Sequence, residues 1–322
     1  MDNITLLVLA NPNDRELALL EGLPKSTTIA VGSDIEAFKR AAPEAQIILN
    51  WTGSRKLLEQ VWAIAPNVKW VHSKSAGLDS TLFPALVESP IPLTNGSGVF
   101  SQSLGEFVVG AALFFAKDFR RLIRNQMAGV WKQDDVEELG KQTMGIVGYG
   151  DIGHACAKRA HALGMRVLGL RRRPEFSKGD PYIDGIYPFE GLLELVPQCD
   201  YVVAAAPLAA GTRHMIGDAA FKAMKKTAVV MNVGRGPVID EEALIRALES
   251  GRIRGAALDV FENEPLPAGH PFFKMENVLL SPHCTDHTTT WLDDAMRFFL
   301  EQYERFASGE PLKNVVDKKA GY

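Results

Sequence analysis

Three polar side chains that could act together on a carbonyl group follow three separate apolar segments of this 322-residue chain. Arg235 stands in a Gly-Arg-Gly turn directly after an apolar run, where no bulky neighbour shields it. Glu264 lies in the loop after Asp259, which ends a second run, and His283 follows a third run and a proline. Together they supply a guanidinium, a carboxylate and an imidazole.

These groups suit the reduction of a carbonyl that is flanked by a carboxylate. A guanidinium can hold the carboxylate, an imidazolium can give a proton to the carbonyl oxygen, and a nearby acid favours the protonated imidazole. Histidine has an ordinary pKa of about 6.5, so it can carry this proton near neutral pH. We therefore expect Arg235, His283 and one of the two nearby acids, Asp259 or Glu264, to be catalytic residues.

A glycine-rich segment indicates where the hydride donor for such a reduction would bind. Gly148, Gly150 and Gly153 have the GxGxxG spacing, directly after a predicted strand and at the start of a predicted helix. In this context the first glycine permits a tight turn and the second lets backbone N–H groups approach a pyrophosphate. The third lets helix and strand pack closely. The segment predicts dinucleotide binding rather than a purely structural turn.

The next predicted strand ends in Arg171, Arg172 and Arg173. At this position an Asp or Glu would bond the ribose hydroxyls of NAD, whereas an arginine accommodates the 2′-phosphate of NADP. No acid occurs from residue 165 to 174, and a guanidinium offers a planar fork for phosphate oxygens. We expect NADP(H) to be favoured over NAD(H). A solvated basic run is the alternative, but it does not account for the missing acid.

The segments that position these residues form two series of apolar runs, each alternating with helical stretches. This alternation is typical of α/β domains with parallel sheets, in which ligands bind beyond the carboxyl ends of the strands. We predict an α/β protein of two domains. A Rossmann-type dinucleotide-binding domain at 101–285 is inserted in a discontinuous flavodoxin-like substrate domain at 1–100 and 286–322, with the site in the cleft between them.

Three helices are marked by their pattern. The segment 101–127 predicts one long helix capped by Ser101, whose broad apolar face fits either a contact between subunits or burial between the domains. Another helix has Asp240 as its cap and Gly251 as its left-handed stop. The segment 288–307 predicts an amphipathic helix by which the chain returns to the first domain.

The composition excludes several classes of protein. A formal net charge of −4 and a pI near 6.0 argue against a nucleic-acid-binding surface. No segment approaches the roughly 18 apolar residues that suggest a membrane span. Cys156, Cys199 and Cys284 cannot all pair, which fits a reducing compartment. We expect a soluble, cytoplasmic protein that acts on a small molecule.

The chain resembles the D-isomer-specific 2-hydroxyacid dehydrogenase family along essentially its whole length. The similarity lies in the segments "SAGLD", "LGEFVVGAAL", "ELGKQTMGIVGYGDIG", "APLAAGTRHMIG", "MNVGRGPVIDEEALIRAL", "GAALDVFENEPLP" and "NVLLSPH", in that order. The family includes glyoxylate/hydroxypyruvate reductases, D-lactate dehydrogenases and phosphoglycerate dehydrogenases.

The resemblance implies a role for each catalytic candidate. Arg235 would bind the carboxylate and the carbonyl group of a small 2-oxo acid. His283, with Glu264 as its partner, would give the proton that completes the D-2-hydroxy acid, and Asp259 would help to hold the nicotinamide. Glyoxylate and hydroxypyruvate are the favoured substrates, and pyruvate is a further candidate.

The resemblance also implies binding residues and a partner. Backbone N–H groups of Ser75, Ala76 and Gly77 would receive the substrate carboxylate. The family is usually dimeric through the long-helix region, which favours a homodimer through residues 101–127. The residues that we expect to bind the cofactor are Gly148, Tyr149, Gly150, Asp151, Ile152, Arg171, Arg172, Arg173, Pro207, Thr212, Val233, Gly234 and Asp259.

One stretch departs from the family pattern. After His283 the family commonly continues with an apolar residue and then small residues, whereas this chain has Cys284, Thr285, Asp286 and His287. A metal site at the two histidines is an alternative interpretation of this stretch. No third ligand is marked and hydride transfer needs no metal, so we expect none.

Two other functions stay open at this point. A cofactor-sensing regulator could use the same fold, as some corepressors in this superfamily do, and would bind NADPH with little or no reduction of a 2-oxo acid. An activity like that of phosphoglycerate dehydrogenase is the second. Trp51, which follows a strand end, is a candidate either for the core or for the lining of the substrate pocket.

Overall fold

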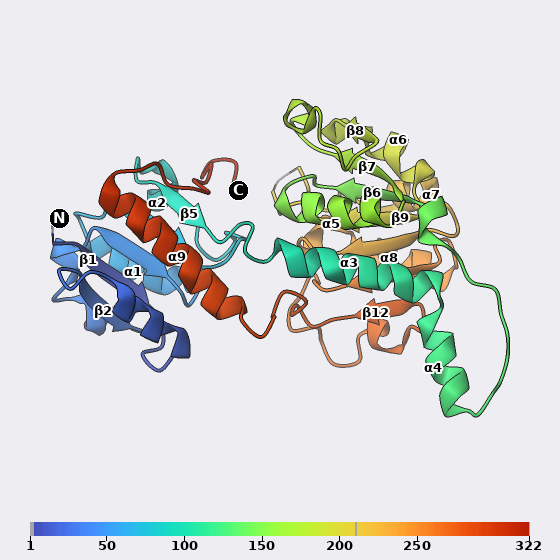
Figure 1. Cartoon of the computed structure of the whole chain (residues 1–322), viewed down its shortest axis with the longest axis horizontal. Helices are drawn as coiled ribbons and strands as arrows, with labels where there is room; N and C mark the ends of the chain where they lie inside the picture. Colours follow the sequence, from blue (N-terminus) through green and yellow to red (C-terminus); the bar gives the residue numbers. More distant parts are fainter. Residues whose placement is uncertain (1–2, 210, 322) are drawn as a thin grey trace. The chain divides into compact units, whose positions relative to one another are not determined.

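The computed structural model describes residues 3–209 and 211–321 and has two compact units (Figure 1). Unit 1 consists of Met1–Phe100 and Thr289–Tyr322, and unit 2 is Ser101–Thr288. Ala210, which belongs to one of the segments quoted for the resemblance, lies outside the described residues. The chain leaves unit 1 after Phe100 and returns to it after Thr288.

Unit 1 is built on a parallel sheet with the strand order β2-β1-β3-β4-β5 in the described residues. Its central strands β1, β3 and β4 are buried at every position, as expected for a parallel sheet that is covered on both faces. The order is the flavodoxin-like one predicted, and it reverses between β1 and β3. The strands are β1 (Thr5–Leu9), β2 (Thr28–Gly32), β3 (Ile47–Asn50), β4 (Trp70–Ser73) and β5 (Leu93–Asn95).

The helices of unit 1 come from both parts of the chain. They are α1 (Arg55–Ile64), α2 (Pro84–Glu88) and α9 (Trp291–Ser308), which is red in Figure 1. Ser54 caps α1 by accepting a hydrogen bond from the amide of Leu57. Helix α9 buries Phe299, whose ring stacks on Trp70 with centroids 5.5 Å apart. The second crossing of the chain therefore completes the core of unit 1.

Unit 2 contains a parallel sheet with the order β12-β11-β10-β9-β6-β7-β8 in the described part of the chain. The order reverses between β6 and β9, so that the loops of the two halves meet at their carboxyl ends. This confirms the predicted Rossmann-type architecture. The strands are β6 (Thr143–Val147), β7 (Arg166–Leu170), β8 (Gly185–Tyr187), β9 (Tyr201–Ala204), β10 (Val229–Asn232), β11 (Gly255–Leu258) and β12 (Val278–Leu280).

Helices cover both faces of this sheet and form two apolar clusters with it. These helices are α3 (Ser101–Ala116), α5 (Asp151–Ala162), α6 (Leu192–Leu195), α7 (Asp218–Ala223) and α8 (Glu241–Glu249). A further helix of the unit, α4 (Phe119–Met127), has no buried residue and belongs to neither cluster. Asp240 caps α8 by accepting a hydrogen bond of 2.9 Å from the amide of Ala243. Gly251 has a φ of 62°, the left-handed conformation that ends such a helix. No helix in 3–209 or 211–321 is long and apolar enough to cross a membrane.

The prediction of one helix over 101–127 is wrong, because the chain breaks between α3 and α4. Asp118 adopts a left-handed φ of 49°, and its carboxylate accepts from the amide of Arg121 to start α4 in a new direction. Ser101 is the first residue of α3 rather than the residue before it. Figure 1 shows α4 projecting from the end of α3, followed by a long extended loop.

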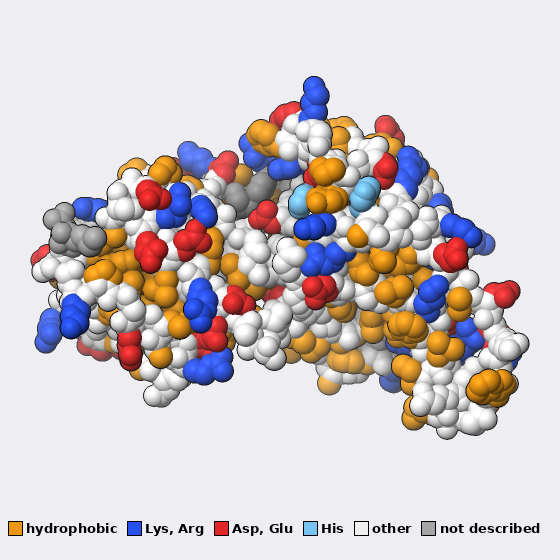
Figure 2. Space-filling view, in the orientation of Figure 1, with side chains coloured by type: hydrophobic (Ala, Val, Ile, Leu, Met, Phe, Trp, Pro, Cys, Tyr) orange, Lys and Arg blue, Asp and Glu red, His pale blue; other side chains and the backbone are white. Residues whose placement is uncertain are grey.

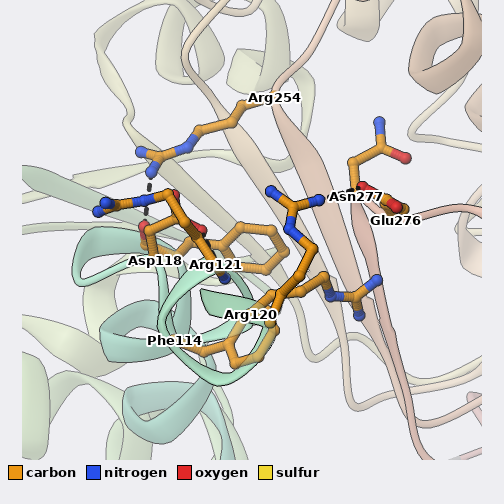
Figure 3. Close-up of a pocket in the computed structure, with 9 residues that line it drawn as sticks. Phe114, Asp118, Arg120, Arg121, Arg254, Glu276 and Asn277 are labelled. Atoms are coloured by element: carbon orange, nitrogen blue, oxygen red, sulfur yellow. Dashed lines mark hydrogen bonds and ion pairs between the residues drawn. The ribbon is translucent and has the colours of Figure 1, made fainter. Parts of the chain in front are cut away.

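Arginine side chains hydrogen-bond the junction between α3 and α4 to the rest of unit 2. They line a hollow of about 260 Å³ at the α3–α4 junction (Figure 3). Arg120 donates 2.7 Å to the carbonyl of Val278 in β12, and Arg254 donates 2.5 Å to the carbonyl of Phe115 at the end of α3. These contacts satisfy carbonyls near the break and fix the direction of α4.

Candidate active site

The predicted acid/base residue and its partner are in direct contact. His283 Nδ1 lies 2.6 Å from Oε2 of Glu264. Because a carboxylate only accepts hydrogen bonds, Nδ1 carries the proton of this bond, and Nε2 on the opposite edge of the ring is the atom left to exchange a proton. The His283 side chain as a whole is 47% exposed.

Glu264 is itself held from its other oxygen. Oε1 accepts a hydrogen bond of 2.9 Å from the amide of Phe261, three residues earlier. The amide of Glu262 bonds the carboxylate of Glu241 at the start of α8, and the side chain of Glu262 pairs with His214 at 2.5 Å. The loop after β11 is therefore held by bonds on both sides, and Glu264 cannot turn away from the imidazole without breaking its bond to the amide of Phe261.

Asp259, directly after β11, organises the turn that carries His283. Its carbonyl accepts from the amide of His283 at 2.8 Å. Its Oδ1 accepts from the amides of Cys284 and Thr285 at 3.0 and 3.2 Å, and Oδ2 accepts from the Thr285 hydroxyl at 2.7 Å. His283 has a φ of 51°, which is uncommon for a residue with a side chain. The bonds to the buried Asp259 offset the strain of that conformation.

The rest of the unusual stretch packs into unit 2. The carbonyl of Thr285 accepts a hydrogen bond of 2.5 Å from Ser103 in the first turn of α3. Asp286 is partly buried, and this burial, with the charge of Asp259 adding to it, raises the pKa of the Asp286 carboxyl. Its Oδ1 lies 3.7 Å from Nε2 of His287, beyond hydrogen-bond range. Within the described ranges, no cluster of three or more His, Cys, Asp or Glu side chains could hold a metal ion.

Arg235 lies beside this loop because two glycines allow a close approach. It follows β10, the neighbour of β11, and its Nη1 donates 2.7 Å to the carbonyl of Gly234. A Cβ atom at Gly236 would stand 1.9 Å from the backbone of Phe261, and one at Gly234 would stand 2.7 Å from the carbonyl of Ala206. The Gly-Arg-Gly turn therefore packs on the loop of Glu264. Because β10, β11 and β12 are neighbouring parallel strands, their carboxyl ends bring the three catalytic candidates to one edge of the sheet.

The glycine-rich turn has the geometry that a pyrophosphate needs. Gly148 has a φ of 99°, and a Cβ atom there would stand 2.4 Å from the amide of Ala206, so only glycine fits. A Cβ atom at Gly153 would stand 2.5 Å from the carbonyl of Gly148, so this glycine lets α5 pack on the strand. A Cβ atom at Gly150 would meet nothing within 4 Å, and Gly150, which directly precedes α5, has no side chain to cap the helix, which starts at Asp151 with Ile152 next. The amides at this helix start are available to an anion.

The side chain of Tyr149, between Gly148 and Gly150, is buried beside this turn and is not exposed to solvent. Its ring is buried against Gly169 of β7, and its hydroxyl donates 3.0 Å to Asp180. Burial raises the pKa of Tyr149, so the phenol stays protonated as a donor. The side chain fixes the distance between the turn and β7.

The arginines after β7 are arranged around one exposed aromatic ring. The guanidinium of Arg173 lies 4.7 Å from the ring centroid of Phe176, and that of Arg171 lies 5.6 Å from it. Arg171 also donates 3.0 Å to the hydroxyl of Ser177. In the described part of the chain, no carboxylate is at ion-pair distance from either Arg171 or Arg173, so their charge is available to an anion. Arg172 lies between them on the exposed side of the turn.

The remaining cofactor candidates of unit 2 follow β9 and β10. The hydroxyl of Thr212 donates 2.6 Å to the carbonyl of Pro207 and accepts 2.8 Å from the amide of Ala209, which closes the loop after β9. Val233 donates its amide to the carbonyl of Ala204 and leads into Gly234. Both loops leave the sheet at its carboxyl edge, beside the switch point between β6 and β9.

The candidate substrate loop belongs to unit 1. Ser75, Ala76 and Gly77 follow β4 and are partly buried. The side chain of Asn95 donates 2.7 Å to the carbonyl of Ala76, and the amide of Gly96 donates 3.3 Å to that of Ser75. Among the described residues, no group accepts from the amides of residues 75–77. Three adjacent N–H groups without an internal acceptor suit a carboxylate.

Residues 109–285 match the family model described as "D-isomer specific 2-hydroxyacid dehydrogenase, NAD binding domain", which covers more than half of the chain. The chain belongs to this family. It is an NAD(P)-dependent 2-hydroxyacid dehydrogenase, and the predictions of family, fold class and enzyme are confirmed.

Relatives of this dehydrogenase agree with that assignment. A glyoxylate reductase from Thermofilum pendens is 36% identical over 241 residues, which cover 72% of this chain and 70% of the relative. A D-isomer specific 2-hydroxyacid dehydrogenase from Xanthobacter autotrophicus, solved with NADPH and MES, is 29% identical with a TM-score of 0.83 over the whole of both chains. An NADPH-dependent glyoxylate/hydroxypyruvate reductase from Sinorhizobium meliloti, solved with NADP and sulfate, is 26% identical, also with a TM-score of 0.83 over both whole chains.

Some residues that shape the dehydrogenase site were not found from the sequence. Thr285 and Ser103 hold the His283 turn, and Ser177 and Phe176 hold the arginines. The only sequence signal for Thr285 was its departure from the family pattern, and the other three carried none. Their roles depend on contacts between segments far apart in the chain or on the path of an irregular loop.

Proposed function

We propose that the protein reduces a small 2-oxo acid to the D-2-hydroxy acid with NADPH, and that His283 donates the proton. Glyoxylate and hydroxypyruvate are the favoured substrates, and pyruvate is a further one. The observation that carries the proposal is the bond of 2.6 Å between His283 Nδ1 and Glu264, which fixes the tautomer and leaves Nε2 for proton transfer.

Each catalytic residue has a defined task in this reaction. The dihydronicotinamide, when bound, supplies the hydride to the keto carbon. Arg235 holds the carboxylate and the carbonyl oxygen, His283 gives its Nε2 proton to that oxygen, and Glu264 stabilises the imidazolium before the transfer. Asp259 contributes to the nicotinamide site and holds the turn of His283, since three groups of that turn already bond its carboxylate.

The cofactor site is assigned to the carboxyl edge of unit 2. The uncapped start of α5 and the open space at Gly150 suit the pyrophosphate. Arg171, Arg172 and Arg173 take the 2′-phosphate, which makes NADPH the preferred donor. NADPH or NADP occurs in the two solved relatives named above, and this supports the preference.

The substrate assignment has two supports. The relative from Thermofilum pendens is a glyoxylate reductase, and the one from Sinorhizobium meliloti is a glyoxylate/hydroxypyruvate reductase. In unit 1, we assign the amides of Ser75, Ala76 and Gly77 to the carboxylate of the acid.

The protein acts as a homodimer through residues 101–127 and the loop that follows them. Apolar side chains gather over α3 and α4 in Figure 2. Ile123 is 55% exposed, Met127 85% and Trp131 96%. A second copy of the chain would remove this surface from water. We place the protein in the cytoplasm, where Cys284, exposed beside His283, stays reduced.

Initial rates of NADPH and NADH oxidation with glyoxylate, hydroxypyruvate and pyruvate test the function. We expect fast turnover with NADPH and at least one of these acids, and slower turnover with NADH. Tight binding of NADPH without turnover of any of the acids would contradict the proposal and favour a cofactor-sensing regulator.

A further inference from the structure

Lys74 in unit 1 has no task in the proposed reaction, although it directly precedes the loop of Ser75–Gly77. It follows β4, and its amide donates 3.2 Å to the carbonyl of Asn50 at the end of β3. Trp51 comes next after Asn50. The side chains of Lys74 and Trp51 therefore leave the sheet at the carboxyl ends of two neighbouring parallel strands.

This end of the sheet is where an open α/β unit binds ligands. The strand order of unit 1 reverses between β1 and β3, and ligands of such sheets bind beyond the carboxyl ends of the strands at that point. Trp51 lies directly after β3, and Asp14 and Glu16 lie in the segment after β1. Lys74 follows β4, the next strand along.

Two indole rings flank the ammonium group of Lys74. Its Nζ lies 5.0 Å from the ring centroid of Trp51 and 5.3 Å from that of Trp291, the first residue of α9. Both distances are within the range of a cation–π contact. The rings come from separate parts of the chain, so their packing against one lysine fixes the cation in place and gives it apolar walls.

Among the described residues, the ammonium group of Lys74 has no carboxylate at ion-pair distance. Burial lowers the pKa of Lys74, and the charges of Asp14 and Glu16 oppose this effect. Neither carboxylate is at ion-pair distance from Nζ, and Glu16 pairs with Arg15 at 3.6 Å. Among the residues that the structure describes, no atom accepts from the three N–H groups of the ammonium. An anion from outside the chain would supply the missing acceptor.

We propose that Lys74, between Trp51 and Trp291, binds a second anionic group on the substrate, so that the enzyme also reduces 2-oxo dicarboxylic acids. The inference rests on the proposed function, because it gives the first carboxylate to the amides of Ser75–Gly77. Lys74 stands directly before these amides, so one acid can engage both.

Two four-carbon acids that differ in charge test this proposal. Steady-state rates with saturating NADPH are measured for 2-oxosuccinate, which has the second carboxylate, and for 2-oxobutyrate, which lacks it; glyoxylate is the reference. The variants are Lys74→Met, Lys74→Gln and Lys74→Arg. Lys69→Met is the matched control, because Lys69 is an exposed lysine of the same unit. Thermal unfolding of every variant reports whether it folds.

We expect Lys74→Met and Lys74→Gln to raise KM for 2-oxosuccinate by about 20-fold, the loss that follows removal of a charge-assisted hydrogen bond. KM for 2-oxobutyrate and glyoxylate should stay near the wild-type values, Lys74→Arg should keep much of the preference, and Lys69→Met should change nothing. Equal losses for all three acids, or no change for any, would overturn the proposal. If the neutral variants do not fold, Lys74→Arg alone tests the proposal. Equal losses of kcat/KM for 2-oxosuccinate and for glyoxylate in Lys74→Arg would then overturn it as well.

The wild-type enzyme separates this proposal from the one on which it rests. If it reduces glyoxylate but not 2-oxosuccinate, only the role of Lys74 is lost. If it oxidises NADPH with none of the three acids, the proposed function itself is lost.

Discussion

Thr285 lies two residues beyond His283, and its hydroxyl donates a hydrogen bond of 2.7 Å to Oδ2 of Asp259. Asp259 is 2% exposed, so this oxygen has no access to water that could replace the bond. The same carboxylate accepts from the amides of Cys284 and Thr285. The hydroxyl thus completes the set of bonds that holds His283 in its left-handed conformation.

Removal of this hydroxyl should affect proton transfer more than cofactor binding. Thr285→Val keeps the shape but leaves Oδ2 of Asp259 unsatisfied, so we expect kcat to fall by about tenfold while Kd for NADPH stays unchanged. Thr285→Ser, the matched control, keeps the hydroxyl and should stay near wild type. Steady-state kinetics with a fluorescence titration of NADPH measure both. If Thr285→Val loses thermal stability but no kcat, the turn is merely structural.

The arginines after β7 should set the choice between the two cofactors. In the variant with Arg171→Ala and Arg172→Ala, we expect Kd for NADPH to rise by about 50-fold, because charge-assisted bonds to the 2′-phosphate are lost. Kd for NADH should change little. Arg166→Ala is the control, since Arg166 is an exposed arginine at the opposite end of the same strand. An equal rise in Kd for NADPH and for NADH would show that the arginines do not bind the 2′-phosphate.

His72 should make unit 1 sensitive to acid. Burial lowers the pKa of His72 to about 3, and Nδ1 lies 2.7 Å from the hydroxyl of Thr94, which also accepts from Trp70. The folded protein keeps this imidazole neutral, whereas the unfolded chain takes up a proton below its ordinary pKa of about 6.5. The stabilisation is therefore complete above that pH and is lost as the pH falls towards 3.

The slope of stability against pH tests this effect. Between pH 6 and 4, His72 should contribute a loss of about 1.4 kcal/mol per pH unit to the free energy of unfolding. His72→Asn cannot titrate, so urea unfolding should show a shallower slope in that variant, even if it is less stable at pH 7. His161→Asn, at an exposed histidine, is the control. Equal slopes in wild type and His72→Asn would mean that His72 does not carry the effect.

The exposed apolar residues after α3 should hold the dimer together. We expect Trp131→Ser to raise the dimer dissociation constant by about 30-fold, as for an aromatic residue at the centre of an interface. Sedimentation equilibrium measures this constant. Leu193→Ser, at a residue that is 52% exposed outside the segment, should leave it unchanged. A monomeric wild type, or equal effects of the two substitutions, would rule out this interface.

The sequence predicts best what local patterns determine. The glycine-rich turn lies between a strand and a helix in the sequence, and Gly148 and Gly153 have the close contacts that their spacing indicates. Asp240 and Gly251 mark the ends of α8 because a cap and a left-handed stop are properties of single residues. The parallel sheets follow from the alternation of apolar runs and helical stretches, which the chain shows throughout.

The sequence predicts poorly what depends on one backbone angle or on contacts between distant segments. The apolar spacing from Phe115 to Phe119 continues a helix, yet the left-handed Asp118 ends it. The bond between Asp259 and Thr285 joins residues 26 positions apart, and it forms because β11 and β12 pair in parallel with a particular register. No local pattern indicates that register.

The measurement that tests the central claim most directly is the single-turnover oxidation of NADPH by glyoxylate in wild type and in His283→Gln, with Kd for NADPH measured on the same samples. The pairing of His283 with Glu264 predicts that His283→Gln slows the reduction by about a thousandfold, within the range for loss of a general acid, and leaves Kd for NADPH unchanged. Reduction at the wild-type rate in His283→Gln would contradict the assignment of His283 as the proton donor.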